Sequence, residues 1–238
     1  MRLELRSLGF DRGFLVELLR SVPRQPLLWF LLAVDAVVIL LHIWIIGLVP
    51  NEQLPRWTDW FRLSLDGSLA EGFEYAKGAV AGLLLLSVAR TRVPAITPVA
   101  LLPLYLVADN AFQIHERFAH WLLPEHQNRG ELAVSVVIAL IMVAVAALAY
   151  RMANPRGRSA ILAVLIGIFL IGFMAAGVDA LHAIVKQFSF HLGRVFLILE
   201  DGGELVAQSV LLVICTVVWR RLGDEGGAGQ LIDFGVKT

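Results

Sequence analysis

Long apolar runs alternate with short polar segments along most of the chain. Two runs, 132–150 and 160–178, contain no charged residue, and each would be about 28 Å long as an α-helix. Four further runs are as long but carry isolated ionisable residues, at 26–49, 68–89, 93–122 and 196–219. Each can cross a hydrocarbon core of about 30 Å. Because the runs are continuous rather than alternating, we predict an all-α, polytopic bundle of six transmembrane helices rather than a barrel.

The segments that flank these runs complete the predicted organisation. Residues 1–25 place Phe14 and Leu18 opposite Arg12, which is typical of an amphipathic helix at a membrane interface. Residues 26–222 form the predicted transmembrane domain. Glycine is frequent from Gly223 onward, and we expect 223–238 to be a flexible tail.

Composition and charge narrow the class of protein. Hydrophobic residues make up 58% of the chain and charged residues 17%, as in a polytopic membrane protein. The 20 basic residues are balanced by 20 acidic ones, which excludes the basic footprint of a nucleic-acid-binding protein, and the single cysteine excludes a disulfide framework. Thirteen of the basic residues fall on one set of helix ends, which predicts cytoplasmic N- and C-termini. The absence of glycosylation or eukaryotic sorting signals fits a bacterial inner membrane.

Acidic residues gather at one depth of the predicted bundle. Glu74, Asp109 and Glu204 lie 16 or 17 residues from the nearest cytoplasmic arginine of their helix, about 24–26 Å along it. Glutamates, aspartates and histidines of five helices reach this level or the turn above. The helix predicted at 132–150 has no acid or histidine at this level, so we expect it to be a lipid-facing strut. Asp35 lies nearer mid-membrane and is interpreted as a separate buried polar contact.

Helical spacing places several of these side chains on common faces. In the third span Asp109, Gln113, Glu116 and His120, at i, i+4, i+7 and i+11, are predicted to share one face of the helix. Three further spacings suggest shared faces: Asp179 with His182, Glu200 with Glu204 and Gln208, and Glu74 with the small residues Gly78 and Gly82.

Carboxylates this close in a low dielectric need protons or a cation, and a bound metal ion is an economical cation. Carboxylate and imidazole ligands suit Fe, Mn or Zn, and one partial match is the dinuclear carboxylate bundle. We therefore predict a metalloprotein that acts, as a hydrolase or oxidoreductase, on a lipid or a periplasmic small molecule. The predicted ligands are Glu74, Asp109, His115, Glu116, Asp179, His182, Glu200 and Glu204.

Other interpretations use the same residues. In a second interpretation the acids translocate protons or divalent cations, with Lys77 as an internal counter-charge, and in a third the chain is a non-catalytic scaffold subunit. In a structural interpretation the acids pair with basic residues at a wet rim, namely Arg62, Lys77, Arg117, Lys186 and Arg194. Glu200 and Asp201 would be first-turn acids if the last helix began there. His42 is expected to be a core histidine.

Three segments carry a resemblance: Glu74-Tyr75-Ala76-Lys77, Asp109 through His115-Glu116-Arg117, and Glu200-Asp201-Gly202-Gly203-Glu204. They resemble an uncharacterised set of bacterial multi-pass membrane proteins with a D…HER helix and an E-D/E-x-x-E helix. Where those proteins tend to have an acidic pair, this chain has Asp109-Asn110. The resemblance implies a membrane fold and no known activity.

Overall fold

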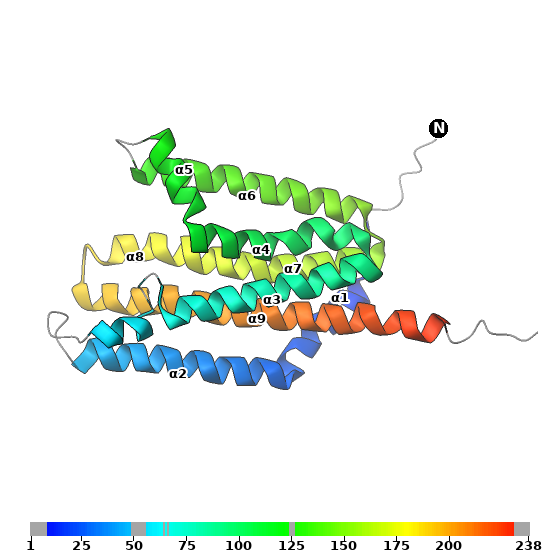
Figure 1. The fold of residues 1–238 in the computed structure, drawn as a ribbon, viewed down its shortest axis with the longest axis horizontal. Helices are drawn as coiled ribbons and strands as arrows, with labels where there is room; N and C mark the ends of the chain where they lie inside the picture. Colours follow the sequence, from blue (N-terminus) through cyan, green and yellow to red (C-terminus); the bar gives the residue numbers. More distant parts are fainter. Residues whose placement is uncertain (1–8, 49–55, 64, 66, 124–126, 231–238) are drawn as a thin grey trace, which may run out of the picture. The chain divides into compact units, whose positions relative to one another are not determined.

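The computed structural model describes residues 9–48, 56–63, 65, 67–123 and 127–230. These residues are helical, with no strand among them (Figure 1). Six helical segments of this described part are long and apolar enough to cross a membrane, as predicted. The elements, in chain order, are α1 Arg12–Ser21, the 3-10 turn η1 Val22–Arg24, α2 Pro26–Leu48, the 3-10 helix η3 Arg56–Phe61, α3 Leu69–Thr91, the 3-10 turn η4 Pro94–Ile96, α4 Thr97–Phe112, α5 Ile114–Leu122, α6 Gln127–Met152, α7 Pro155–Gly172, the π-helical η5 Phe173–Val178, α8 Asp179–Val185 and α9 Phe190–Gln230.

The chain divides into two compact units. The first unit comprises 1–19, 79–163 and 215–238, and the second comprises 20–78 and 164–214. Helices α3, α7 and α9 each contribute residues to both. Each unit is described below by its own contacts.

In the first unit, α4, α5 and α6 pack together (Figure 1). Gly82 of α3 allows α4 to approach closely, because a Cβ at Gly82 would lie 2.5 Å from Leu104 Cγ. This confirms the close helix approach expected at Gly82, while the rest of the expected small-residue stripe stays a prediction. Gly130 does the same where α6 meets α5: a Cβ there would lie 2.8 Å from the carbonyl oxygen of Ala119.

The predicted N-terminal helix is present as α1, and polar contacts hold it in the first unit. Ser159 Oγ donates to the carbonyl of Asp11 (2.7 Å), and the Arg158 guanidinium donates to the carbonyl of Gly9 (3.0 Å). Arg221 pairs with Glu17 at 2.9 Å. The location of α1 at a membrane interface stays a prediction. At the other end of the chain, α9 continues beyond Gly223 to Gln230, and residues 1–8 and 231–238 of the predicted terminal segments lie outside the described residues.

The third predicted span is not one continuous helix, which corrects the expectation of a shared acidic face. Gln113 adopts a left-handed conformation, with φ 50° and ψ 45°, and ends α4 before α5 begins. Asp109 compensates for the break, because its carboxylate accepts the backbone N–H of His115 (3.0 Å), one of the first N–H groups of α5 without an intrahelical partner. Asp109, Glu116 and His120 therefore do not follow one helical stripe.

The second unit is built around the start of α9. Leu205 packs in a buried cluster with Leu63 and Ala70. His42 is buried and its Nδ1 accepts the backbone N–H of Leu63 (3.1 Å), which confirms it as a core histidine. Within its most apolar stretch the α9 span is 72% buried. The same measure for α6 of the first unit is 11%, which agrees with the low burial expected of a lipid-facing strut.

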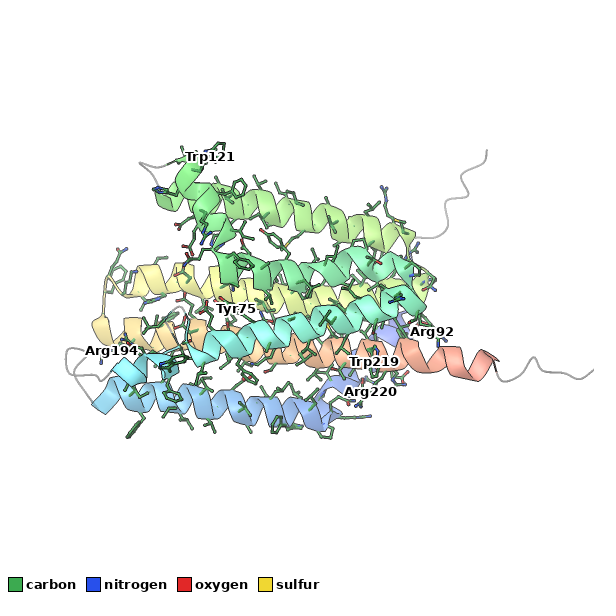
Figure 2. All side chains as sticks on the ribbon, viewed as in Figure 1. Tyr75, Arg92, Trp121, Arg194, Trp219 and Arg220 are labelled. Carbon is green, nitrogen blue, oxygen red and sulfur yellow. The ribbon has the colours of Figure 1, made fainter. Side chains whose placement is uncertain are left out.

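The N-terminus of α3 explains one acid of the predicted acidic level. Ser68 Oγ accepts the backbone N–H of Glu71 (3.2 Å), and the Glu71 carboxylate accepts a bond from the backbone of Gly67. This arrangement is similar to a capping box, except that the Glu71 carboxylate accepts from Gly67, one residue before the N-cap Ser68. Tyr75, labelled in Figure 2, donates to the same carboxylate. Glu71 therefore has a structural role.

Candidate metal centre

Three residues of the second unit bring potential ligand atoms together. One ligand atom each from Asp179, His182 and Glu200 lies within 4.8 Å of the other two. His182 Nδ1 is 2.9 Å from Glu200 Oε2. His182 and Glu200 are partly exposed, with side-chain exposures of 16% and 17%, and Asp179 is exposed. A histidine with two carboxylates is a ligand set that suits Zn, Mn or Fe.

A π-helical turn positions two of these residues. The segment η5 ends at Val178, and Asp179 is the next residue. Asp179 and His182, at i and i+3, lie on one face of α8, as predicted. π-helical turns of this kind occur most often at functional sites, because the extra residue rotates the side chains that follow relative to a regular α-helix.

Two glycines of α9 bring Glu200 to the pair. A Cβ at Gly203 would lie 2.6 Å from Met174 Sδ of η5, and a Cβ at Gly202 would lie 3.1 Å from Ile39 Cδ1 of α2. The side chains of Met174 and Ile39 therefore pack directly on the α9 backbone, within one turn of Glu200. The helix begins at Phe190 and runs unbroken through this region, so Glu200 and Asp201 are not first-turn acids.

Further carboxylates surround the triad. Glu204 interacts electrostatically with Asp201, Glu200 and Asp179, and Glu74 of α3 interacts with Glu204 and Asp201. Asp201 Oδ2 is buried and has no hydrogen-bond partner among the described residues. Lys186 is a nearby cation, because it interacts with Glu200. Negative charge is thus in excess around the triad.

Lys77 also interacts electrostatically with Glu74, but its direct polar contacts are to other groups. Its Nζ lies 2.7 Å from Asp35 Oδ1, and it donates to the carbonyl of Leu205 (2.8 Å) and sits 4.3 Å from the centroid of the Phe73 ring. Ser209 Oγ donates to the other oxygen of Asp35 (2.6 Å). The separate buried contact predicted for Asp35 is confirmed. Lys77 lies in the interior rather than at a wet rim.

The remaining predicted ligands lie in the first unit. Asp109 Oδ2 is 2.9 Å from His115 Nδ1, and its Oδ1 accepts a bond from the Tyr105 hydroxyl (3.4 Å). Glu116 follows His115 in the first turn of α5. The structure thus brings Asp109 together with His115, and Asp179 with His182 and Glu200, as two groups in different units.

Sequence reasoning missed two residues that act through tertiary contacts alone. Met174 packs beside the triad against Gly203, and Ser209 completes the separate cluster of Asp35 and Lys77. The π-helical turn has only a weak signal in the sequence, namely Gly172 and Gly177, which are separated by four other residues in an otherwise apolar run.

Together these features define the class: a helical protein with six candidate membrane spans and a histidine–carboxylate cluster. The family model described as "Domain of unknown function (DUF8692)" matches residues 30–219, and the chain belongs to this family. No curated protein and no solved structure matches the chain. The expectation of an uncharacterised family is met, while the particular motif resemblance stays a prediction.

Proposed function

We propose that this protein is a membrane metalloprotein that binds a divalent transition metal at Asp179, His182 and Glu200. The observation that carries the proposal is the convergence of three ligand atoms within 4.8 Å. The proposed reaction is hydrolysis through a metal-bound water, or oxidation if the metal is iron, with a lipid or another membrane-accessible small molecule as the substrate.

The geometry of the triad supports this assignment. Ligand atoms bound at about 2.1 Å lie about 3.4 Å apart in a tetrahedral site, and in an octahedral site about 3 Å apart when adjacent and about 4.2 Å apart when opposite one another. The separation of 2.9 Å between His182 Nδ1 and Glu200 Oε2 fits adjacent ligands. The exposed Asp179 side chain can rotate inward to close the third position. Three protein ligands leave room for a water or a substrate, as in catalytic metal sites.

Charge balance supports it as well. Asp179 and Glu200 carry two negative charges, which a divalent cation neutralises with His182 as a neutral ligand. Without a cation, these carboxylates and the nearby Asp201 and Glu204 repel one another in a poorly solvated region. Lys77 is held by Asp35, so it is poorly placed to replace that cation.

The test is elemental analysis of protein purified in detergent, with metal reported per chain. We expect close to one equivalent of Zn, Mn or Fe in the wild type and at least a tenfold loss in His182→Gln and Glu200→Gln. His120→Gln is the matched control, because His120 is an exposed histidine of α5, outside the triad, and its substitution should leave the metal content unchanged.

Equal metal contents in the wild type and both triad variants would overturn the proposal. In that case, proton or cation flux in proteoliposomes that is abolished by Glu204→Gln would favour the translocation hypothesis instead.

A further inference from the structure

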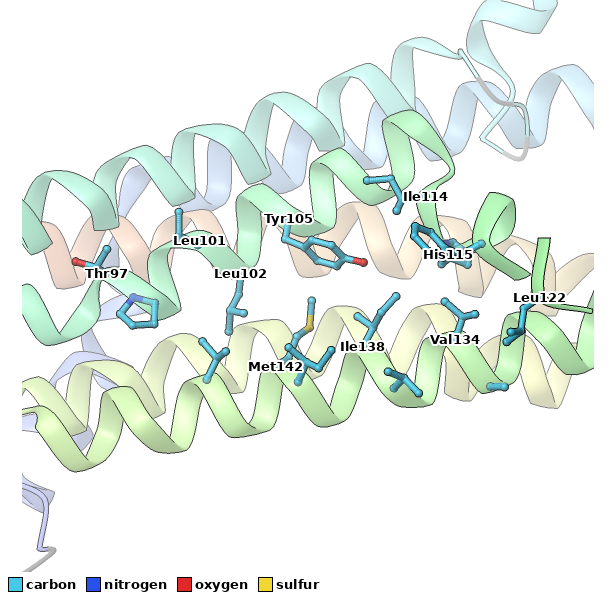
Figure 3. A pocket seen from close by; sticks show the side chains of 16 residues that line it. Thr97, Leu101, Leu102, Tyr105, Ile114, His115, Leu122, Val134, Ile138 and Met142 are labelled. Carbon is cyan, nitrogen blue, oxygen red and sulfur yellow. The ribbon is translucent and has the colours of Figure 1, made fainter. Parts of the chain in front are cut away.

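A long apolar cavity lies between α4, α5 and α6 of the first unit. Its volume is about 820 Å³, within the range of about 300–1,000 Å³ typical of small-molecule sites. Figure 3 shows α4 along one side and α6 along the other. Leu102 of α4 points toward Ile138 and Met142 of α6, and the lining of the cavity is almost wholly apolar.

The break at Gln113 shapes one end of this cavity. Because α4 stops there, α5 turns against the start of α6 and places His115, Phe118 and Leu122 in the cavity wall. A continuous helix would have carried these side chains past the end of the cavity. The same break brings His115 to Asp109.

The polar groups of the cavity wall lie mostly at this end. The Tyr105 hydroxyl reaches toward His115 in Figure 3, and both side chains bond Asp109. The Asp109 carboxylate is an acceptor and fixes the proton of a neutral His115 ring on Nδ1. His115 Nε2 is then an acceptor, and it makes no hydrogen bond within the described part of the chain.

The dimensions indicate what fits. The lining residues of α6 run from Ala133 to Val145, about 18 Å along the helix. One leaflet of a hydrocarbon core about 30 Å thick is about 15 Å deep, so the cavity matches the length of one lipid chain. An acceptor nitrogen at one end selects a head group that can donate a hydrogen bond.

We propose that this cavity is a binding site for a single-chain lipid with a hydroxyl head group, whose chain lies between α4 and α6 and whose hydroxyl donates to His115. The site is independent of the triad at Asp179, His182 and Glu200, and it assigns Asp109 and His115 to lipid recognition rather than to metal ligation.

The probes for the test are oleyl alcohol and (Z)-9-octadecene, which share the same cis-unsaturated eighteen-carbon chain and differ in the hydroxyl. Native mass spectrometry of the detergent-purified full chain counts bound molecules. We expect one oleyl alcohol per chain at saturation and a dissociation constant about fivefold higher for (Z)-9-octadecene, the ratio that one net hydrogen bond of about 1 kcal/mol gives. His115→Phe keeps the ring and should abolish this preference.

A matched pair on α6 tests the location. Val137 lines the cavity, whereas its neighbour Val136 does not, and the two are similarly exposed at 55% and 50%. Val137→Trp should lower oleyl alcohol occupancy at least tenfold, and Val136→Trp should leave it unchanged. Equal occupancy in the two variants would overturn the proposal. Equal binding of the alcohol and the alkene by the wild type would also overturn it, and this result needs no substitution to be tolerated.

Discussion

Two charged clusters of the second unit differ in how completely the protein encloses them. Lys77 and Asp35 have side-chain exposures of 1% and 0%, whereas His182 and Glu200 have exposures of 16% and 17%. Each cluster contains a basic and an acidic side chain in close contact. Lys77 Nζ lies 2.7 Å from Asp35 Oδ1, and His182 Nδ1 lies 2.9 Å from Glu200 Oε2. The closeness of the pair therefore does not distinguish them.

They differ in how many of their polar atoms already have partners. Both oxygens of Asp35 are hydrogen-bonded, one by Lys77 and the other by Ser209, and Lys77 also reaches the carbonyl of Leu205. Such a closed cluster has no free position for a ligand.

The triad has more acceptors than donors. Asp179 is exposed, the nearby Asp201 Oδ2 is buried without a hydrogen-bond partner among the described residues, and the carboxylates outnumber the cations around them. The comparison teaches that a buried ion pair whose polar atoms all have partners indicates a structural role, whereas a partly open pair with further carboxylates beside it indicates capacity for a ligand.

The largest expected effect is the loss of one member of the closed pair. Lys77→Met leaves Asp35 as a buried, uncompensated charge and should lower the free energy of unfolding by about 3–5 kcal/mol. Adding Asp35→Leu removes that charge and should restore most of the stability. Unfolding in detergent, monitored by tryptophan fluorescence, measures both. Lys186→Met is the exposed control, and an equal effect of the two lysine substitutions would contradict the structural role.

The sequence contained a usable signal for this pair. Asp35 lies 11 residues from Arg24 and Lys77 lies 13 from Arg90, which places them within about 3 Å of the same depth. Few charges of opposite sign lie so deep in the apolar runs. The six spans were predictable for a related reason, because uninterrupted apolar runs have few alternatives in a membrane.

The triad was only partly predictable. Asp179 and His182 follow from their i, i+3 spacing, but their distance to Glu200 depends on Met174 packing against Gly203, a contact between segments far apart in the chain. The break at Gln113 gave no signal, since glutamine is an unusual residue in a left-handed conformation. It depends on Asp109 holding the first turn of α5.

The next largest effect is stabilisation by added zinc, which is expected for the triad and not for the cluster of Lys77 and Asp35. At a zinc concentration one hundred times its dissociation constant, binding to the folded triad should stabilise the wild type by about 2.7 kcal/mol. Glu200→Gln should lose this increase, while Lys77→Met, although less stable, should keep it. Thermal unfolding with and without zinc measures the difference. A zinc-dependent increase that survives Glu200→Gln would assign the binding to other groups.

The smallest expected effect concerns Ser209, and it tests whether the closed cluster acts as a unit. Ser209→Ala removes the hydroxyl bonded to Asp35 and should cost about 1–2 kcal/mol, whereas Ser87→Ala, which removes an exposed bond to a helix carbonyl, should cost less than about 0.5 kcal/mol. In the Lys77→Met background Asp35 has Ser209 as its only donor among the described side chains, so the Ser209→Ala cost should increase. Additive costs in the double-mutant cycle would mean that Ser209 and Lys77 stabilise Asp35 independently, and the contrast with the open triad would then depend on exposure alone.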